Sequence, residues 1–324
     1  MLDFFQSIGG FIMAPLYYVI SAILVGFHKV WGAAFGAESG AAWALSIICL
    51  TLVIRILLIP LFVKQIKSSR NMQLIQPKVK ELQKKYGHDR EKLAQETMAL
   101  YKETGTNPFA SCLPILLQMP IFLALFRMLD QAAKNKKGHG FLTTDLATKF
   151  GEAKLFGVVP ISQTFLKADG AVGVMVLAAF LVLAMTATTF LTQRQLMSKN
   201  MPADALSGPY AQQQKLLLYV LPLVFAVGGI AFPIGVLLYW TTSNLWTMGQ
   251  QFYVIRNNPA PGTPAFKAKQ DRDKAKADRK GVKPEAEVSQ EDLDAAEAAK
   301  VEQERRAAQR QQPKRQTRSQ RKKP

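Results

Sequence analysis

A single cation inside an apolar run long enough to cross a membrane constrains this chain more than any other feature. The run from Ala41 to Val63 has 23 residues, and Arg55 is its only charged residue. At about 1.5 Å per residue, Arg55 would lie roughly 12 Å from the Val63 end of a hydrocarbon core about 30 Å thick. An arginine at that depth costs roughly 2.5 to 3.5 kcal/mol on insertion scales, so we expect its side chain to face protein or trapped water.

A shorter helix is the alternative interpretation of this run. Arg55 would then lie at the headgroups, and the residues from Ile56 to Val63 would lie along the membrane surface. The apolar residues that separate Arg55 from Lys64 favour burial instead. Pro60 cannot hydrogen bond to the carbonyl of Ile56, so we expect a kink one turn beyond the arginine and a freed carbonyl that water can reach.

The distribution of apolar residues predicts an all-α polytopic membrane protein. Hydrophobic residues make up 49% of the 324 residues, and they gather in long runs that a single water-soluble core would not need. Together with 41–63, we predict five spans, the others being at about 107–129, 171–191, 216–231 and 234–249.

The last two predicted spans form a short hairpin. Each has 16 residues, roughly 24 Å as a helix, and only Phe232 and Pro233 lie between them. Spans this short are expected to thin the bilayer around them.

Residues 1–40 are predicted to form an external N-terminal segment with an interfacial amphipathic helix. The apolar stretch from Leu16 to Phe27 is short, and His28, Lys29 and Trp31 follow it. A helix in the plane of the interface suits such a stretch, with a sixth span as the alternative. The only early charge is Asp3, so the segment does not resemble a cleaved signal peptide.

Loop charges predict the orientation. The segment 64–106 carries ten Lys and Arg against five acids, and the end after Gly249 is denser in cations, so both are expected in the cytoplasm with the N-terminus outside. The loop 130–170 is then external, although it holds six lysines and four acids. This loop argues against the topology without reversing it.

The cytoplasmic segment 64–106 is predicted to be a helical hairpin. An apolar stripe repeats at steps of three and four residues up to Tyr86, and Gly87 is expected to end that helix. Asp89 can cap the second helix, and Gly105 can close it. The stripe packs the two helices together, which leaves the tip at 84–90 exposed for contacts.

Residues 257–324 are predicted to be a largely disordered, basic cytoplasmic tail, with helix possible only around 285–310. The tail has eighteen Lys and Arg against eleven acids. Nine cations follow Glu304 without an intervening acid: Arg305, Arg306, Arg310, Lys314, Arg315, Arg318, Arg321, Lys322 and Lys323. Such a block suits a polyanion, either ribosomal RNA or anionic lipid headgroups.

Several separate motifs in this order resemble the YidC family of membrane protein insertases. They are Thr51-Leu-Val-Ile-Arg55, Gln76-Pro77-Lys78, the tract from Asn107 to Phe122 that contains Gln118-Met-Pro120, and Leu238-Tyr-Trp-Thr-Thr-Ser-Asn244 with Gln250-Gln251. The resemblance runs from about residue 12 to 256. No large external domain and no lipobox cysteine precede the Arg55 span, so the chain is similar to the shorter form of the family.

The resemblance implies a five-span insertase that receives nascent membrane proteins in a hydrophilic groove and releases them sideways into the bilayer. Arg55 would be the cation of the groove, with Gln118, Trp240 and Thr51 beside it. The hairpin would engage incoming clients, and the tail would help to dock translating ribosomes. A Sec-type channel is a further possible partner.

Asn244 belongs to the polar patch Thr241 to Asn244, which either lines the groove or hydrogen bonds to other helices. Thr186, Thr188 and Thr189 are expected to bond to their own helix.

Other classes of protein fit the sequence less well. An anion-binding transporter or channel could use Arg55, but no internal repeat and no second charge near the midplane accompany it. The chain has no P-loop, GxSxG or HExxH motif, so we expect neither an enzyme nor a cofactor, and no use of nucleotide. Cys49 and Cys112 are expected to be inert core residues within the spans.

Overall fold

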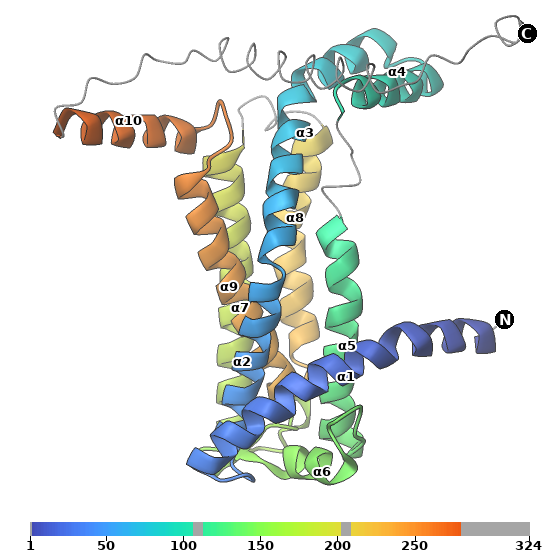
Figure 1. Cartoon of the computed structure of the whole chain (residues 1–324), viewed down its shortest axis with the longest axis vertical. Coiled ribbons are helices and arrows are strands. Elements are labelled where there is room, and N and C mark those ends of the chain that lie inside the picture. The colour runs from blue at the N-terminus through green and yellow to red at the C-terminus, as the bar shows by residue number, and fades with distance from the viewer. Residues whose placement is uncertain (1, 106–112, 202–208, 280–324) are drawn as a thin grey trace, which may run out of the picture. The chain divides into compact units, whose positions relative to one another are not determined.

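The computed structural model describes residues 2–105, 113–201 and 209–279. Helices dominate, and a short β-hairpin is the only sheet within these ranges (Figure 1). The helices are α1 (Leu2–Phe35), α2 (Gly40–Leu57), α3 (Ile59–Tyr86), α4 (Arg90–Glu103), α5 (Leu113–Asn135), α6 (Thr144–Glu152), α7 (Val172–Asn200), α8 (Pro209–Gly229), α9 (Ile234–Asn257) and α10 (Pro264–Arg279). The two strands are β1 (Lys154–Leu155) and β2 (Val159–Pro160).

Three segments within the described ranges are long and apolar enough to cross a membrane: Met13–Phe35, Gly40–Leu57 and Val172–Asn200. Gln214–Gly229 is a shorter apolar helix. The all-α membrane class predicted from the sequence is confirmed. The number of five spans remains a prediction.

The predicted kink beyond Arg55 is a complete helix break. Helix α2 ends at Leu57 and α3 begins at Ile59, with Pro60 in the first turn of α3. The carbonyl of Ile56 is not freed for water as expected, because it accepts the Leu58 N–H. A proline in the first turn loses no helical hydrogen bond, and this is why the break precedes it.

The helical hairpin has the predicted caps. Helix α3 runs through to Tyr86, and the Asp89 side chain accepts the N–H of Lys92 at the start of α4. Gly105 follows α4 in the left-handed conformation, which glycine adopts without a steric cost. Helices α3 and α4 pack against each other.

Helices α7, α8 and α9 are longer than the spans predicted from the sequence. Helix α7 extends nine residues beyond 191, and α8 and α9 have 21 and 24 residues instead of 16. The apolar residues mark the part that suits lipid. The polar residues that follow this part in α7 and α9, and that precede it in α8, continue the helix. The tight turn predicted at Phe232 and Pro233 is longer in the structure, where α8 ends at Gly229 and α9 begins at Ile234.

Helix α1 is one continuous helix that packs against α2 and α5 and lies obliquely across them (Figure 1). Ile20, Leu24 and His28, which repeat every four residues, form its buried face, and Tyr18 and Val19 on the other side are exposed. The structure gives α1 a longer range than the predicted interfacial helix. Whether it spans or lies on the membrane remains a prediction.

The loop after α5 holds α1 in place. Ser21 Oγ accepts the N–H of Phe141, and the Tyr17 ring stacks on His139 at 4.5 Å between centroids. His139 Nε2 also bonds to Gln131 Oε1. Burial lowers the pKa of His139 below its ordinary value, and the charges of nearby Lys137 and Arg127 lower it further.

The predicted disordered tail is wrong for residues 264–279, which form α10. Ala, Lys, Gln and Arg favour helix, Pro264 suits its first turn, and Thr263 Oγ1 accepts the N–H of Phe266. The compact unit formed by 1–269 ends within this helix. The nine tail cations from Arg305 to Lys323, Cys112 and the motif residues 107–112 lie outside the described residues.

The buried core lies where α1, α2, α5, α7 and α9 meet the loop 136–171. Trp43 at its centre is fully buried, stacks on His28 and meets Phe150 edge to face. The core thus closes one end of the helix bundle with apolar side chains. The Arg55 end of α2 lies beyond it, one turn past the buried Leu50 and Thr51.

Candidate functional site

Arg55 lies in the last turn of α2 and points to α9. Its Nη2 donates to Ser243 Oγ, and its guanidinium lies 5.9 Å from the centre of the Phe62 ring on α3. The break at Leu58 brings Phe62 to this position. Both partners are electrically neutral, so they stabilise the cation without cancelling its charge.

Ser243 belongs to a polar cluster that joins three helices. Tyr239, one turn earlier on α9, is almost fully buried at 4% exposure. The side chains of Gln118 from α5 and of Ser243 lie within hydrogen-bonding reach of its hydroxyl. Gln118 Oε1 is buried and has no hydrogen-bond partner among the residues that the structure describes. A buried acceptor of this kind is costly unless water or a ligand reaches it.

A cavity of about 280 Å³ adjoins the guanidinium, between α3, α7 and α9. Since one water needs only about 15 Å³ of such space, it has room for a cluster of waters. Its polar lining includes Arg55, Gln65, Asn200, Thr247, Gln250 and Gln251. We call this space the Arg55 cavity.

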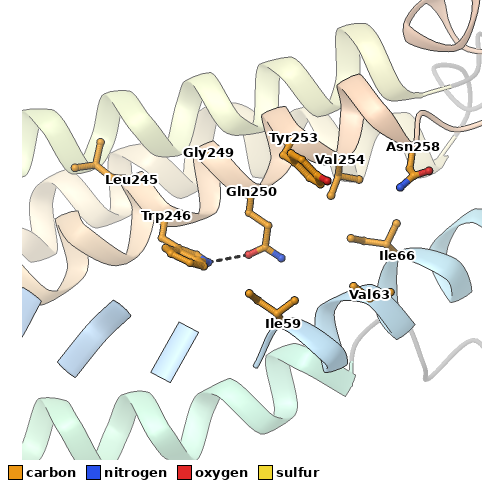
Figure 2. Close-up of a pocket in the computed structure, with 10 residues that line it drawn as sticks. All are labelled: Ile59, Val63, Ile66, Leu245, Trp246, Gly249, Gln250, Tyr253, Val254 and Asn258. Atoms are coloured by element: carbon orange, nitrogen blue, oxygen red, sulfur yellow. Dashed lines mark hydrogen bonds between the residues drawn. The ribbon is translucent and has the colours of Figure 1, made fainter. Parts of the chain in front are cut away.

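A second, larger cavity lies between α3 and α9 (Figure 2). Its volume is about 610 Å³, and its walls are mostly apolar. Ile59, Val63 and Ile66 line it from α3, and Leu245 and Trp246 line it from α9. We call this space the α3–α9 pocket. It shares the four residues Ile66, Gln250, Val254 and Asn258 with the Arg55 cavity, so the two adjoin.

The structure places the predicted groove residues in different surroundings. Arg55 lines the cavity, and Gln118 belongs to the polar cluster beside it. Thr51 is buried, and its hydroxyl donates to Ile47 O of its own helix. The described lining of the Arg55 cavity does not include Thr51, Trp240 or Asn244.

Trp240 lies in an aromatic cluster on another face of α9. Its ring centre is 4.8 Å from Phe225, 5.1 Å from Phe122 and 5.6 Å from Phe232. These contacts join α9 to α5 and α8. The large area of aromatic rings stabilises such packing.

Asn244 connects α9 to α7. Its Nδ2 donates to Thr189 Oγ1 at 3.0 Å and to Met185 O at 3.3 Å, and Thr241 donates to Leu181 O at 3.3 Å. Of the two interpretations of this polar patch, these contacts favour interhelical hydrogen bonding. Thr186, Thr188 and Thr189 bond to their own helix as expected.

Sequence reasoning missed the role of Tyr239 and did not single out Ser243 from its patch. Their spacing of four residues places both on one face of α9, which was the available signal. The side chains of Gln65 and Asn200 were also missed. Each lies beyond a predicted span, and only the longer helices bring it to the cavity.

The charge around the two cavities is of one sign. Among the described residues that line them there is no carboxylate, and Arg55 carries the formal charge. Within the described parts of the chain, no group of three His, Cys, Asp or Glu residues could hold a metal ion. The arrangement can attract an anion or a negatively charged segment, with the amides as hydrogen-bond donors.

The fold and the site together define an all-α membrane protein with a cation beside an internal polar cavity. Known proteins identify its family. Residues 34–261 match the family described as 60Kd inner membrane protein, and the chain belongs to that family.

Two relatives are named membrane protein insertase YidC. The one from Streptomyces avermitilis is 47% identical over 272 residues, which cover 82% of this chain and 62% of the relative. The one from Tropheryma whipplei strain Twist is 38% identical over 286 residues, covering 84% of this chain and 91% of the relative. The chain thus spans less than two thirds of the first relative and most of the second.

A solved structure described as an active YidC insertase with its first transmembrane domain resolved is also similar. It matches 72% of this chain and 46% of its own, with 21% identity and a TM-score of 0.45. The family match over residues 34–261 and the two relatives confirm the resemblance to the family predicted from the sequence motifs, and the chain is a bacterial membrane protein.

Proposed function

We propose that this chain is a membrane protein insertase that receives nascent membrane proteins in the Arg55 cavity. The observation that carries the proposal is a guanidinium with neutral partners, placed beside a polar cavity inside an otherwise apolar helix bundle. The names of its relatives support the same activity.

The cavity would lower the cost of moving polar groups across the membrane. At an effective dielectric constant near 20, opposite unit charges about 4 Å apart gain roughly 4 kcal/mol. Arg55 would therefore attract an acidic segment that is to be translocated. A membrane potential of about 100 mV adds roughly 2.3 kcal/mol for each charge that crosses completely. Together these terms favour passage without nucleotide hydrolysis.

Release would occur sideways into lipid. Helix α8 carries a set of exposed apolar side chains, and α5 exposes Met119 and Leu123. The α8 set is Leu216, Tyr219, Val220, Leu223, Val224 and Val227. An apolar client segment that passes this surface stays buried until it reaches the acyl chains, and the hydrophobic effect drives that transfer.

The proposal includes the topology of five spans with the N-terminus outside and the C-terminus in the cytoplasm. The α3–α4 hairpin and the basic tail would then face the ribosome. The tail cations suit ribosomal RNA or anionic lipid headgroups, and a Sec-type channel could act beside the chain.

The test replaces the cation. Purified chain in liposomes should insert a reporter with an acidic translocated tail. Arg55→Ala should reduce the rate of that insertion at least about tenfold. A tenfold change corresponds to about 1.4 kcal/mol, which is less than the roughly 4 kcal/mol of attraction between Arg55 and one acidic group. Arg55→Lys should largely restore it, because the charge returns. A reporter with a neutral tail should respond much less.

The matched control is Arg127→Ala, which removes an exposed arginine from α5. Equal insertion by wild type and Arg55→Ala across several acidic-tailed reporters would contradict the proposal. Arg55-dependent release of a trapped small anion from liposomes, with no effect on insertion, would favour a transporter or channel.

A further inference from the structure

The α3–α9 pocket is apolar along most of its length and polar at one end. Leu245, Trp246 and Ile59 line one part, whereas Asn258 lies at the other end near Ile66 and Val254 (Figure 2). The volume of about 610 Å³ is within the range of ligand sites, roughly 300 to 1,000 Å³. A ligand that fits must therefore be apolar over most of its length and polar at one end.

The apolar part of the pocket is open to the side of the bundle. Ile59 is 39% exposed, Val63 46%, Leu245 50% and Tyr253 65%. From Leu245 to Val254, α9 rises about 13.5 Å, close to half of a hydrocarbon core about 30 Å thick. The pocket is thus about as long as one leaflet is thick.

The adjoining Arg55 cavity offers hydrogen-bond donors. Gln250 Oε1 accepts the Trp246 N–H at 3.0 Å, so the amide nitrogen of Gln250 points away from the indole into the space toward α3 (Figure 2). Asn200 Oδ1 likewise accepts the N–H of Ala260 at 2.8 Å, which leaves its amide nitrogen as the donor. Both amides have their acceptor atoms occupied by the protein.

These donors and the guanidinium form a lining complementary to an anion. The amide nitrogens of Gln250 and Asn200 can donate N–H groups to a ligand, and Arg55 adds a positive charge to the same cavity. The described lining of this cavity contains no carboxylate that would oppose an anion. A phosphate group has several acceptor oxygens and a negative charge, so it fits this lining better than a neutral polar group does.

We propose that the two cavities form one binding site for an anionic glycerophospholipid of the membrane. An acyl chain lies in the α3–α9 pocket, and the phosphate lies at the shared polar end, against the amides of Gln250, Asn200 and Asn258. The proposed site consists of residues from the two cavities and includes none of the tail cations, and its occupancy does not depend on insertion activity.

A substitution at Gly249 can block the pocket without changing the rest of its lining. It lines the pocket, and a Cβ added there meets nothing within 4 Å, so Gly249→Phe fills the space without a backbone clash. Gly228 on α8 is the matched control, because its Cβ also meets nothing within 4 Å and it lines neither cavity. Gly228→Phe adds the same ring elsewhere in the bundle.

The probe is phosphatidylglycerol with brominated acyl chains, which quench a nearby indole. The chain is reconstituted into phosphatidylcholine vesicles with Trp246 as its only tryptophan and the other three changed to Phe. Brominated phosphatidylglycerol should quench Trp246 saturably, at a mole fraction about tenfold below that needed with brominated phosphatidylcholine. Gly249→Phe should remove the saturable part, and Gly228→Phe should retain it.

Native mass spectrometry of the chain with all four tryptophans gives a second readout if the single-tryptophan variant does not fold. Phosphatidylglycerol should remain bound after detergent exchange in wild type and Gly228→Phe, and it should be lost in Gly249→Phe. Equal quenching by the two brominated lipids, or unchanged lipid retention in Gly249→Phe, would overturn the proposal. So would a photo-crosslinker at position 249 that reacts with a stalled client and never with lipid.

Discussion

The hydrogen bonds of Asn244 predict a stability effect that separates its two possible roles. Asn244→Ala removes two bonds from α9 to α7, one to Thr189 Oγ1 and one to Met185 O. Interhelical hydrogen bonds in membrane proteins average about 0.6 kcal/mol and reach about 1.7. We therefore expect the substitution to lower the free energy of unfolding by about 1.2 kcal/mol.

A double-mutant cycle isolates the side-chain pair. Thr189→Val removes the acceptor of one bond, so the combined variant should show a coupling energy of about 0.6 kcal/mol with Asn244→Ala. The measurement is equilibrium unfolding in mixed detergent micelles, followed by circular dichroism. Thr242→Val is the control, because the Thr242 hydroxyl bonds to Leu238 O of its own helix.

Insertion of the acidic-tailed reporter decides between packing and groove lining. If Asn244 only packs α9 against α7, Asn244→Ala should insert the reporter at nearly the wild-type rate under conditions where it is folded. A coupling energy near zero, together with a large loss of insertion at unchanged stability, would refute the packing interpretation.

Three further predictions concern caps and loops. Asp89→Ala should cost about 1 kcal/mol of helix stability by removing the cap on Lys92 N–H, seen as faster hydrogen exchange at the start of α4. Gly140→Ala should weaken the contact between α1 and the loop that follows α5. The φ of +60° costs alanine about 1 kcal/mol, and the added Cβ would collide with Ser21 Oγ. The yield of cysteine crosslinks from α1 to that loop should therefore fall. Because the pKa of His139 is lowered in the folded chain, the unfolded chain binds more protons than the folded chain between the folded pKa and the ordinary value of 6.5. The free energy of unfolding should therefore fall as the pH drops through 6.5 toward the folded pKa. Melting at about pH 8 and about pH 5 checks this, and His139→Gln should flatten the difference.

Local signals explain what the sequence could predict. The Asp89 cap, the glycine that closes α4 and the break before Pro60 each depend on a few neighbouring residues. Such features need no knowledge of distant parts of the chain. The turn before Ile234 was predictable for the same reason, because only Phe232 and Pro233 separate the two apolar runs.

The partners of Arg55 required the fold. Periodicity places Thr51 and Arg55 on one face of α2, but it does not say that Thr51 bonds backward to Ile47 O while Arg55 reaches across to Ser243. Trp240 and Ser243 lie three residues apart on α9 and face different neighbours. Only the packing of α9 against the surrounding helices decides which of the two contacts the cation. Side-chain roles at helix contacts are tertiary properties.

The break at Leu58 explains how a helix bundle can hold a cation without neutralising it. The three ion pairs found within the described ranges all lie in or beside the loop 130–170, and none involves Arg55. Arg55 instead lies in the last turn of α2, where the exposed carbonyl ends of a helix carry partial negative charge. A continuous helix would remove that helix end and carry Phe62 to another face. A carboxylate partner would stabilise the cation more strongly, but it would also compete with an acidic client or a phosphate. Neutral acceptors, a helix end and an aromatic ring keep the positive charge available to whatever enters the cavity.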